Sequence, residues 1–241
     1  MAKEKIIVAL DVDTAEKAEE LVRQLKDEVG AFKVGLELFN SSGPGIFELL
    51  RSAGARRLFY DAKFHDIPNT VGRASRAAVG FGVWMINVHC LGGSAMMRSA
   101  ADSARDEAEK MGVGRPLVIG VTVLTSMDQA AVESELRVGK PVAEYVRHLA
   151  VLAKNSGLDG VVASPHEIGI IRDACGSEFL IVTPGVRPAS ADLGDQKRVM
   201  TPGDAVRQGA DYLVIGRPIT QATNPVEAAR TIVRSISVAV D

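Results

Sequence analysis

The densest group of chemically capable side chains in this sequence is the segment 61–66, which reads Asp-Ala-Lys-Phe-His-Asp. It ends a short apolar run, and in an extended strand Asp61 and Lys63 point to the same side, about 6.5–7 Å apart along the chain. An ammonium held between carboxylates stays charged, because nearby opposite charges favour the charged form. Lys63 is therefore better suited to donating a proton than to forming a Schiff base, which needs a neutral amine.

Other polar residues follow or interrupt short apolar runs in the same way. Asp11 follows Ile-Ile-Val-Ala-Leu, Lys33 lies within Phe-Lys-Val-Gly, and His89 follows Ile-Asn-Val. Later runs end at Thr125, Pro184-Gly185 and Gly216-Arg217. If these runs are strands that end on one side of a sheet, their polar residues converge there, either as a reactive site or as an ion-pair network that only closes the sheet.

The elements that must position these residues alternate along the whole chain. Short β-branched runs predict eight strands, at 6–11, 32–36, 57–63, 85–89, 117–124, 160–163, 180–184 and 212–216. Apolar residues at helical spacing predict helices between and after them, including 14–28, 95–110, 142–154 and 225–238. Pro225 after Asn224 suits a helix start, where the missing N–H costs nothing.

Strict alternation of strands and helices predicts a parallel sheet that is buried on both faces. Eight such units in 241 residues match a (β/α)8 TIM barrel better than an open doubly wound sheet. No linker or change in composition divides the chain, so we expect one α/β domain over residues 1–241. In such a barrel the polar strand ends face the active-site mouth.

Composition narrows the function further. The 28 Lys and Arg nearly balance the 30 Asp and Glu, giving a net charge of −2, which offers no electrostatic basis for binding nucleic acid or an anionic membrane. Cys90 and Cys175 lie too far apart for a zinc motif. The first residues lack a signal-peptide pattern, and the most apolar window, 78–97, is interrupted by polar residues and glycines. We expect a cytoplasmic protein without a membrane span.

The histidines do not indicate a metal site. Neither His-x-His nor His-x-x-x-His spacing occurs, so we expect no bound metal. His89 is expected to form a buried hydrogen bond, and no chemical role follows for His65 from its position.

The segment 61–71, Asp-Ala-Lys-Phe-His-Asp-Ile-Pro-Asn-Thr-Val, resembles the motif of the orotidine 5′-phosphate decarboxylase family. Further segments similar to that family occur in the same order, at 9–11, 32–35, 87–89, 123–126, 183–188, 195–196 and 214–218. The resemblance spans nearly the whole chain, and the eleven-residue motif is highly specific.

This resemblance implies the last step of UMP synthesis, in which the C6 carboxylate of orotidine 5′-monophosphate is removed without metal or organic cofactor. Lys63 would donate the proton to C6, and Asp61 would lie against the leaving carboxylate. Asp11 and Lys33 match positions that contact the ribose, and Lys33 also orients the charge network.

The remaining substrate contacts follow from the same resemblance. Gly216 and Arg217 would bind the phosphate, although a strand-ending turn with a solvated arginine is the alternative. Arg187 and Gln196 belong to a long polar segment, 187–200, which suggests a lid. Thr125 and Ser126 would meet the pyrimidine edge, and Pro184 is a further expected substrate-binding residue.

The resemblance also implies a homodimer with shared active sites. Asp66 follows the predicted strand end, and Pro68 then turns the chain toward a helix that begins near Asn69. Asp66, Ile67 and Thr70 would enter the partner's site. The alternative is that Asp66 only caps the following helix.

Two other functions remain open from the sequence. A magnesium-dependent phosphosugar lyase of the 3-keto-gulonate-6-phosphate decarboxylase or hexulose-phosphate synthase type shares the Asp-x-Lys-x-x-Asp core. The continuation Ile-Pro-Asn-Thr and the segment Thr-Pro-Gly-Val-Arg-Pro favour the nucleotide enzyme. A catalytically idle phosphate-binding barrel is disfavoured, because Lys33, Asp61, Lys63 and Asp66 are all present.

Overall fold

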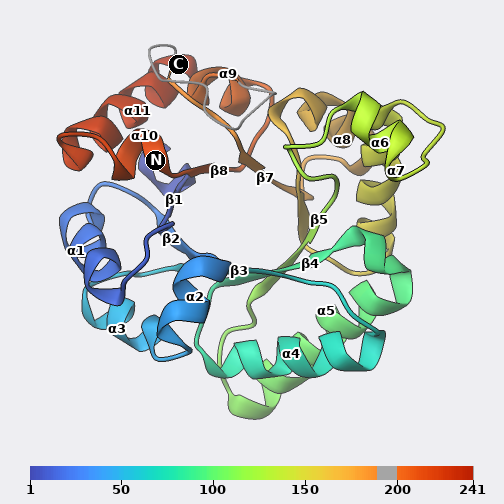
Figure 1. Ribbon diagram of the computed structural model, residues 1–241, viewed down its shortest axis with the longest axis horizontal. Coiled ribbons are helices and arrows are strands. Elements are labelled where there is room, and N and C mark those ends of the chain that lie inside the picture. Colours follow the sequence, from blue (N-terminus) through green and yellow to red (C-terminus); the bar gives the residue numbers. More distant parts are fainter. Residues whose placement is uncertain (189–199, 241) are drawn as a thin grey trace.

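Eight parallel strands close into a barrel at the centre of the computed structural model, which describes residues 1–188 and 200–240 (Figure 1). The strands are β1 (Ile6–Ala9), β2 (Ala31–Val34), β3 (Leu58–Phe64), β4 (Met85–His89), β5 (Leu117–Val121), β6 (Gly160–Val162), β7 (Leu180–Pro184) and β8 (Tyr212–Ile215). Each strand pairs with its successor in sequence, and β8 pairs with β1. The predicted TIM barrel is confirmed.

Helices form a ring outside the barrel (Figure 1). They are α1 (Ala15–Leu25), α2 (Leu36–Ser42), α3 (Ile46–Ser52), α4 (Pro68–Gly80), α5 (Gly93–Met111), α6 (Gln129–Ser134), α7 (Val142–Asn155), α8 (Ile168–Cys175), α9 (Pro202–Arg207), α10 (Arg217–Thr220) and α11 (Pro225–Val240). Short 3-10 turns lie at Ala2–Lys5, Cys90–Gly92 and Pro165–Glu167. The four helices predicted by range correspond to α1, α5, α7 and α11.

Local sequence signals explain where two of these helices begin. The Thr14 hydroxyl accepts a hydrogen bond from the Lys17 N–H and caps α1. The Asn224 side chain accepts one from the Glu227 N–H, and Pro225 occupies the first position of α11, as expected.

The fifth strand is shorter than predicted. It ends at Val121 rather than at residue 124, because its neighbour β6 ends at Val162 and the Thr122 N–H makes the last ladder bond, to the Val162 carbonyl. Residues 123–125 are thereby free of the sheet and line the barrel mouth.

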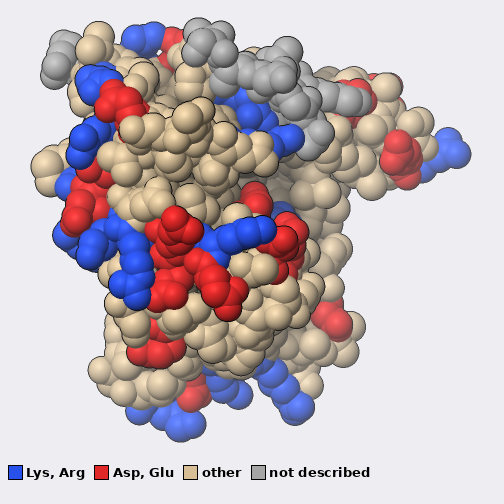
Figure 2. All heavy atoms as spheres, turned by 60° about the vertical axis from the view of Figure 1, so that its left-hand side comes forward, with Lys and Arg blue, Asp and Glu red and all other residues tan. Residues whose placement is uncertain are grey.

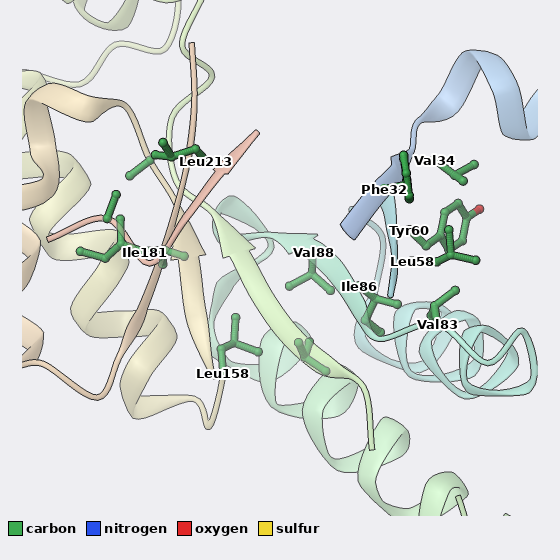
Figure 3. Packing of buried hydrophobic residues seen from close by; sticks show 14 of the residues in the cluster. Phe32, Val34, Leu58, Tyr60, Val83, Ile86, Val88, Leu158, Ile181 and Leu213 are labelled. Carbon is green, nitrogen blue, oxygen red and sulfur yellow. The ribbon is translucent and has the colours of Figure 1, made fainter. Parts of the chain in front are cut away.

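Alternate strand residues build two apolar layers. Inside the barrel the layer consists of Ile7, Ala31, Phe59, Met85, Ile119 and Val182. Outside it, strand residues such as Ile86, Val88 and Leu213 pack toward the helices (Figure 3). Burial on both faces explains why the strands read as nearly continuous apolar runs.

The molecular surface around α1 and α11 carries both signs of charge, interspersed (Figure 2). Ion pairs join Lys17 to Asp13, Arg23 to Glu19, and Arg230 to Glu28. This face therefore has no single-sign patch of the kind that binds a nucleic-acid backbone. Among residues 1–188 and 200–240, no helix is long and apolar enough to cross a membrane.

Candidate active site

A cavity of about 260 Å³ opens at the mouth of the barrel, where the strands reach their carboxyl ends. Its size suits a small-molecule ligand and not a macromolecule. The sequence-predicted site residues that line it are Asp11, Lys33, Asp61, Lys63, Thr125, Pro184, Arg187, Gly216 and Arg217. Residues separated by more than 200 positions are thus brought together by closure of the barrel.

Opposite charges alternate across one wall of this cavity. Lys33 Nζ lies 2.9 Å from Asp11 Oδ1 and 3.2 Å from Asp61 Oδ2. The other oxygen of Asp61, Oδ1, lies 2.8 Å from Lys63 Nζ. We call the series Asp11–Lys33–Asp61–Lys63 the charged chain. Its second and fourth members are cations, and it matches the predicted network.

Burial and charge act against each other within the charged chain. Burial alone would lower the pKa of Lys33, but the Asp61 and Asp11 carboxylates outweigh it, and the pKa lies above its ordinary value. Burial would raise the pKa of Asp61, but Lys33 and Lys63 outweigh it, and the pKa lies below its ordinary value. Both groups therefore stay ionised near neutral pH despite being buried.

An irregularity in β3 shapes this wall. The pairs Tyr60–Ile86 and Phe64–Val88 leave three residues of β3, 61–63, opposite the single residue Asn87 of β4. Lys63 adopts a positive φ of 50° there. The sequence predicts Asp61 and Lys63 on one side of a regular strand, in which side chains alternate between the two faces. In the structure both residues lie in a β-bulge instead.

Two residues without an assigned role in the sequence analysis support the charged chain. Asn87 is fully buried and contacts both Asp61 and Lys63. A Cβ at Gly35 would stand only 3.0 Å from Lys33 Nζ, so glycine leaves room for the Lys33–Asp11 pair. The available signal for Asn87 was a lone amide inside an otherwise apolar strand.

Four predicted residues lie outside the cavity of their own chain: Asp66, Ile67, Thr70 and Ser126, all of them exposed. Asp66 Oδ1 accepts a hydrogen bond from the Ile67 N–H at 2.6 Å, whereas Ile67 itself is the N-cap of α4. Asp66 therefore does not cap α4 in the expected manner. Gln196 and most of the predicted lid segment lie outside the described residues.

The histidines near the mouth stack on each other. The rings of His65 and His89 lie 5.2 Å apart, and burial, His65 and Lys63 together lower the pKa of His89 to about 4. Within the described part of the chain, the buried Nδ1 of His89 has no hydrogen-bond partner, so the expected bond is not formed at that atom. No group of three or more His, Cys, Asp or Glu among the described residues could hold a metal ion.

A TIM barrel with alternating lysines and aspartates on the wall of a cavity at the carboxyl ends of its strands is a barrel enzyme equipped for electrostatic and proton-transfer chemistry. Residues 4–232 match the model of the orotidine 5′-phosphate decarboxylase / HUMPS family. The chain belongs to this family, and it is an enzyme of the carboxy-lyase class.

Similar proteins extend over the same length. Orotidine 5′-phosphate decarboxylase of Moorella thermoacetica is 55% identical over 235 residues, covering 98% of this chain and 93% of that protein. The Nostoc enzyme of the same name is 46% identical and covers both chains fully. A crystal structure of orotidine 5′-phosphate decarboxylase from Lactobacillus acidophilus superposes with a TM-score of 0.84 at 38% identity, covering 96% of this chain and 98% of that one.

Proposed function

We propose that this enzyme decarboxylates orotidine 5′-monophosphate to UMP, the last step of de novo pyrimidine nucleotide synthesis. The observation that carries the proposal is the charged chain at the cavity wall, with Lys63 at its outer end. The curated relatives quoted above, at 46% and 55% identity, bear the name of this activity and favour it over a phosphosugar lyase.

The chemistry follows from the charges. The bond between C6 and its carboxylate breaks, CO2 leaves, and the electron pair stays on C6. The Lys63 ammonium stabilises the developing negative charge and then transfers a proton to C6, after which the neutral amine recovers a proton from solvent. No step requires a metal or an organic cofactor.

Asp61 places a second negative charge beside the leaving carboxylate. Two like charges about 4 Å apart repel by about 4 kcal/mol at an effective dielectric constant of about 20. This amounts to only part of the roughly 8–23 kcal/mol by which enzymes commonly lower barriers. The greater part must come from charge stabilisation at C6 and from binding energy of groups that do not react.

Most of the residues that we propose for binding those non-reacting groups line the cavity. Asp11 and Lys33 would bind the ribose hydroxyls, and Arg217 with the backbone at Gly216 would bind the phosphate. Arg187, which is buried beside the cavity, would assist at the phosphate end together with Gln196. Assigned to the pyrimidine are Thr125, Ser126 and Pro184.

The enzyme is proposed to act as a homodimer with shared sites. Asp66, Ile67 and Thr70 are exposed on the segment that leaves the mouth, and Ile67 is 66% exposed despite being apolar. Their positions outside their own cavity support a role in the partner's cavity. A small-metabolite substrate and a cytoplasmic location complete the proposal.

A metal-free turnover assay tests this function. Purified protein is mixed with orotidine 5′-monophosphate and EDTA, and the pyrimidine absorbance is followed. Turnover that is independent of metal supports the proposal. Absence of turnover, with activity on a sugar phosphate that appears on addition of magnesium, would favour the phosphosugar lyase instead.

A further inference from the structure

Asn87 is a fully buried polar residue of the barrel interior that the proposed chemistry does not use. It lies in β4 between the apolar inner layer, to which Met85 of the same strand belongs, and the charged chain above it. A buried amide is costly unless its donor and acceptor are both satisfied. The hydrogen-bond partners of Asn87 therefore indicate what this residue does in the site.

Both the NH2 group and the oxygen of the Asn87 amide form hydrogen bonds with residues of the charged chain. Its Nδ2 donates to Asp61 Oδ1 at 2.7 Å, and its Oδ1 accepts the backbone N–H of Lys63 at 2.7 Å. The orientation of the amide is unambiguous, because a carboxylate can only accept here and a backbone N–H can only donate. One side chain thus links the position of Asp61 to the backbone of Lys63.

The backbone of Lys63 needs such a partner. Its φ of 50° lies in the left-handed region, which is unfavourable for a residue with a side chain unless the surroundings hold it there. In the bulge, Lys63 has no register partner of its own in β4, because the flanking pairs are Tyr60–Ile86 and Phe64–Val88 and three residues share the space opposite Asn87. The Asn87 side chain takes the place of the missing ladder bond.

The same carboxylate oxygen receives two donors. Asp61 Oδ1 accepts from Asn87 Nδ2 and from Lys63 Nζ, while Oδ2 faces Lys33. Asn87 thus fixes the plane of the Asp61 carboxylate from the side of the barrel interior. The carboxylate in turn sets the positions of the Lys33 and Lys63 ammonium groups, which pair with it. Removal of the amide would leave Asp61 anchored by its cations alone.

We propose that Asn87 is a positioning residue of the decarboxylation, holding the Lys63 backbone in its strained bulge and the Asp61 carboxylate in the orientation that aims the Lys63 ammonium at the substrate. This proposal rests on the proposed function. Asn87 does not line the cavity and would act only through Asp61 and Lys63.

Two variants test it. Asn87→Ala removes both bonds, and kcat is expected to fall by about 100-fold, as misplacement of a reactive group by about 1 Å can cost, while KM changes by less than about 3-fold. Asn87→Asp keeps the shape but puts a carboxyl group beside Asp61. Two adjacent carboxyl groups cannot both ionise freely, so activity should persist at low pH and fall as the introduced group loses its proton.

The pH profile separates positioning from a purely structural role. In Asn87→Asp, kcat should begin to fall at a distinctly lower pH than in the wild type, because the introduced carboxyl group loses its proton there. The matched control is Thr122→Val, which removes another buried side-chain bond, from Thr122 Oγ1 to the Val162 carbonyl at 3.0 Å, without contact to the charged chain. It should leave kcat and its pH profile unchanged.

A second readout does not depend on turnover. Hydrogen exchange of the Lys63 amide, followed by NMR on the intact protein, should be slow in the wild type and in Thr122→Val and at least about 10-fold faster in Asn87→Ala, because the bond that protects the amide is lost.

These measurements can overturn the proposal independently of the proposed function. Wild-type kcat in Asn87→Ala, or an unchanged pH profile in Asn87→Asp with turnover lowered only in proportion to lost folded protein, would show that Asn87 is merely structural. If the wild type did not decarboxylate the nucleotide at all, the proposed function would fail, whereas the exchange rate would still report whether Asn87 holds Lys63. Should Asn87→Ala not fold, the isosteric Asn87→Asp carries the test.

Discussion

The two ends of the barrel handle positive charge in opposite ways. At the amino-terminal end, the Arg57 guanidinium lies 4.8 Å from the ring centre of Trp84, pairs with Glu4 and donates to the Gly30 carbonyl. At the carboxyl end, Lys33 is held inside the barrel between two carboxylates, and Lys63 lines the cavity. One cation covers the closed base, and the other two face an open cavity.

This difference indicates which charges serve stability and which serve chemistry. Arg57 donates hydrogen bonds to Gly30 and Glu4 and packs its guanidinium over Trp84, and these contacts stabilise the fold. At the mouth, Lys33 is buried between two carboxylates and Lys63 is partly exposed beside the cavity, an arrangement that contributes little net stability but preorganises charge. Substitutions at the two ends should therefore have separable effects.

The largest effect is expected for Lys63→Ala. Loss of the proton donor and of the cation nearest C6 should reduce kcat by at least about 1,000-fold, while Asp61 keeps Lys33 as a partner and the barrel stays folded. Turnover and thermal unfolding are measured on the same sample. Near-normal turnover would remove Lys63 from the mechanism.

Subunit exchange should recover activity from two inactive variants. Asp66→Asn and Lys63→Ala homodimers are mixed, and heterodimers then contain one site with both defects and one with neither, if Asp66 serves the partner's cavity. Activity should rise toward one intact site per heterodimer. Heterodimers that are demonstrably formed yet remain inactive would show that Asp66 acts within its own subunit.

Arg217→Ala should be harmful only to a phosphorylated substrate. Charge-assisted hydrogen bonds from arginine to phosphate typically contribute about 1.5–3 kcal/mol, so kcat/KM for the nucleotide should fall by about 10- to 150-fold. Turnover of the corresponding nucleoside, measured in parallel, should change little. Equal losses on both substrates would make Arg217 a structural residue.

Arg57→Ala should show the opposite pattern at the base. Loss of its contact with Trp84 and of its bond to Glu4 should lower the free energy of unfolding by about 1–2 kcal/mol, with kcat of the folded enzyme unchanged. Urea unfolding and turnover are compared with Arg56→Ala, a neighbouring exposed arginine, as a control. A large loss of kcat in folded Arg57→Ala would abolish the contrast between the two ends.

The smallest effect concerns acid stability. Burial and the nearby His65 and Lys63 hold the pKa of His89 at about 4, below the ordinary histidine value of 6.5, so the unfolded chain binds the proton more readily than the folded one. The folded state is therefore favoured above pH about 6.5, and this contribution is lost as the pH falls toward 4. His89→Gln should make the urea midpoint less pH-dependent over this window, whereas His148→Gln should not. An identical pH dependence in His89→Gln and wild type would refute the assignment.

The fold was predictable because its signals are local and repeated. Each strand is an apolar run of a few residues, and eight of them alternate with helical periodicity. The end of β5 was not predictable, since it depends on where the neighbouring β6 stops and not on the residues of β5. The local sequence therefore predicts that a strand exists, whereas the length of the strand depends partly on the strand paired with it.

The candidate site likewise has features that the local sequence predicts and features that depend on how the strands pair. Asp11, Asp61 and Lys63 could be grouped because each falls at the carboxyl end of a predicted strand, and Lys33 joined them as a charged residue within a neighbouring predicted strand. The bulge at 61–63 and its bond to Asn87 could not, because both depend on the register between β3 and β4. Among the residues that the structure describes, His89 Nδ1 lacks a hydrogen-bond partner, and this too depends on packing that no spacing rule describes.

The most direct test of the account is the deuterium content of UMP formed in 2H2O. Wild-type enzyme, freed of metal with EDTA, is given orotidine 5′-monophosphate, and the product is examined by NMR at C6. Departure of CO2 with the electron pair left on C6, followed by transfer from the exchanged Lys63 ammonium, predicts metal-independent formation of UMP carrying one deuterium at C6. No product without a divalent metal, or a product without deuterium at C6, would contradict the account.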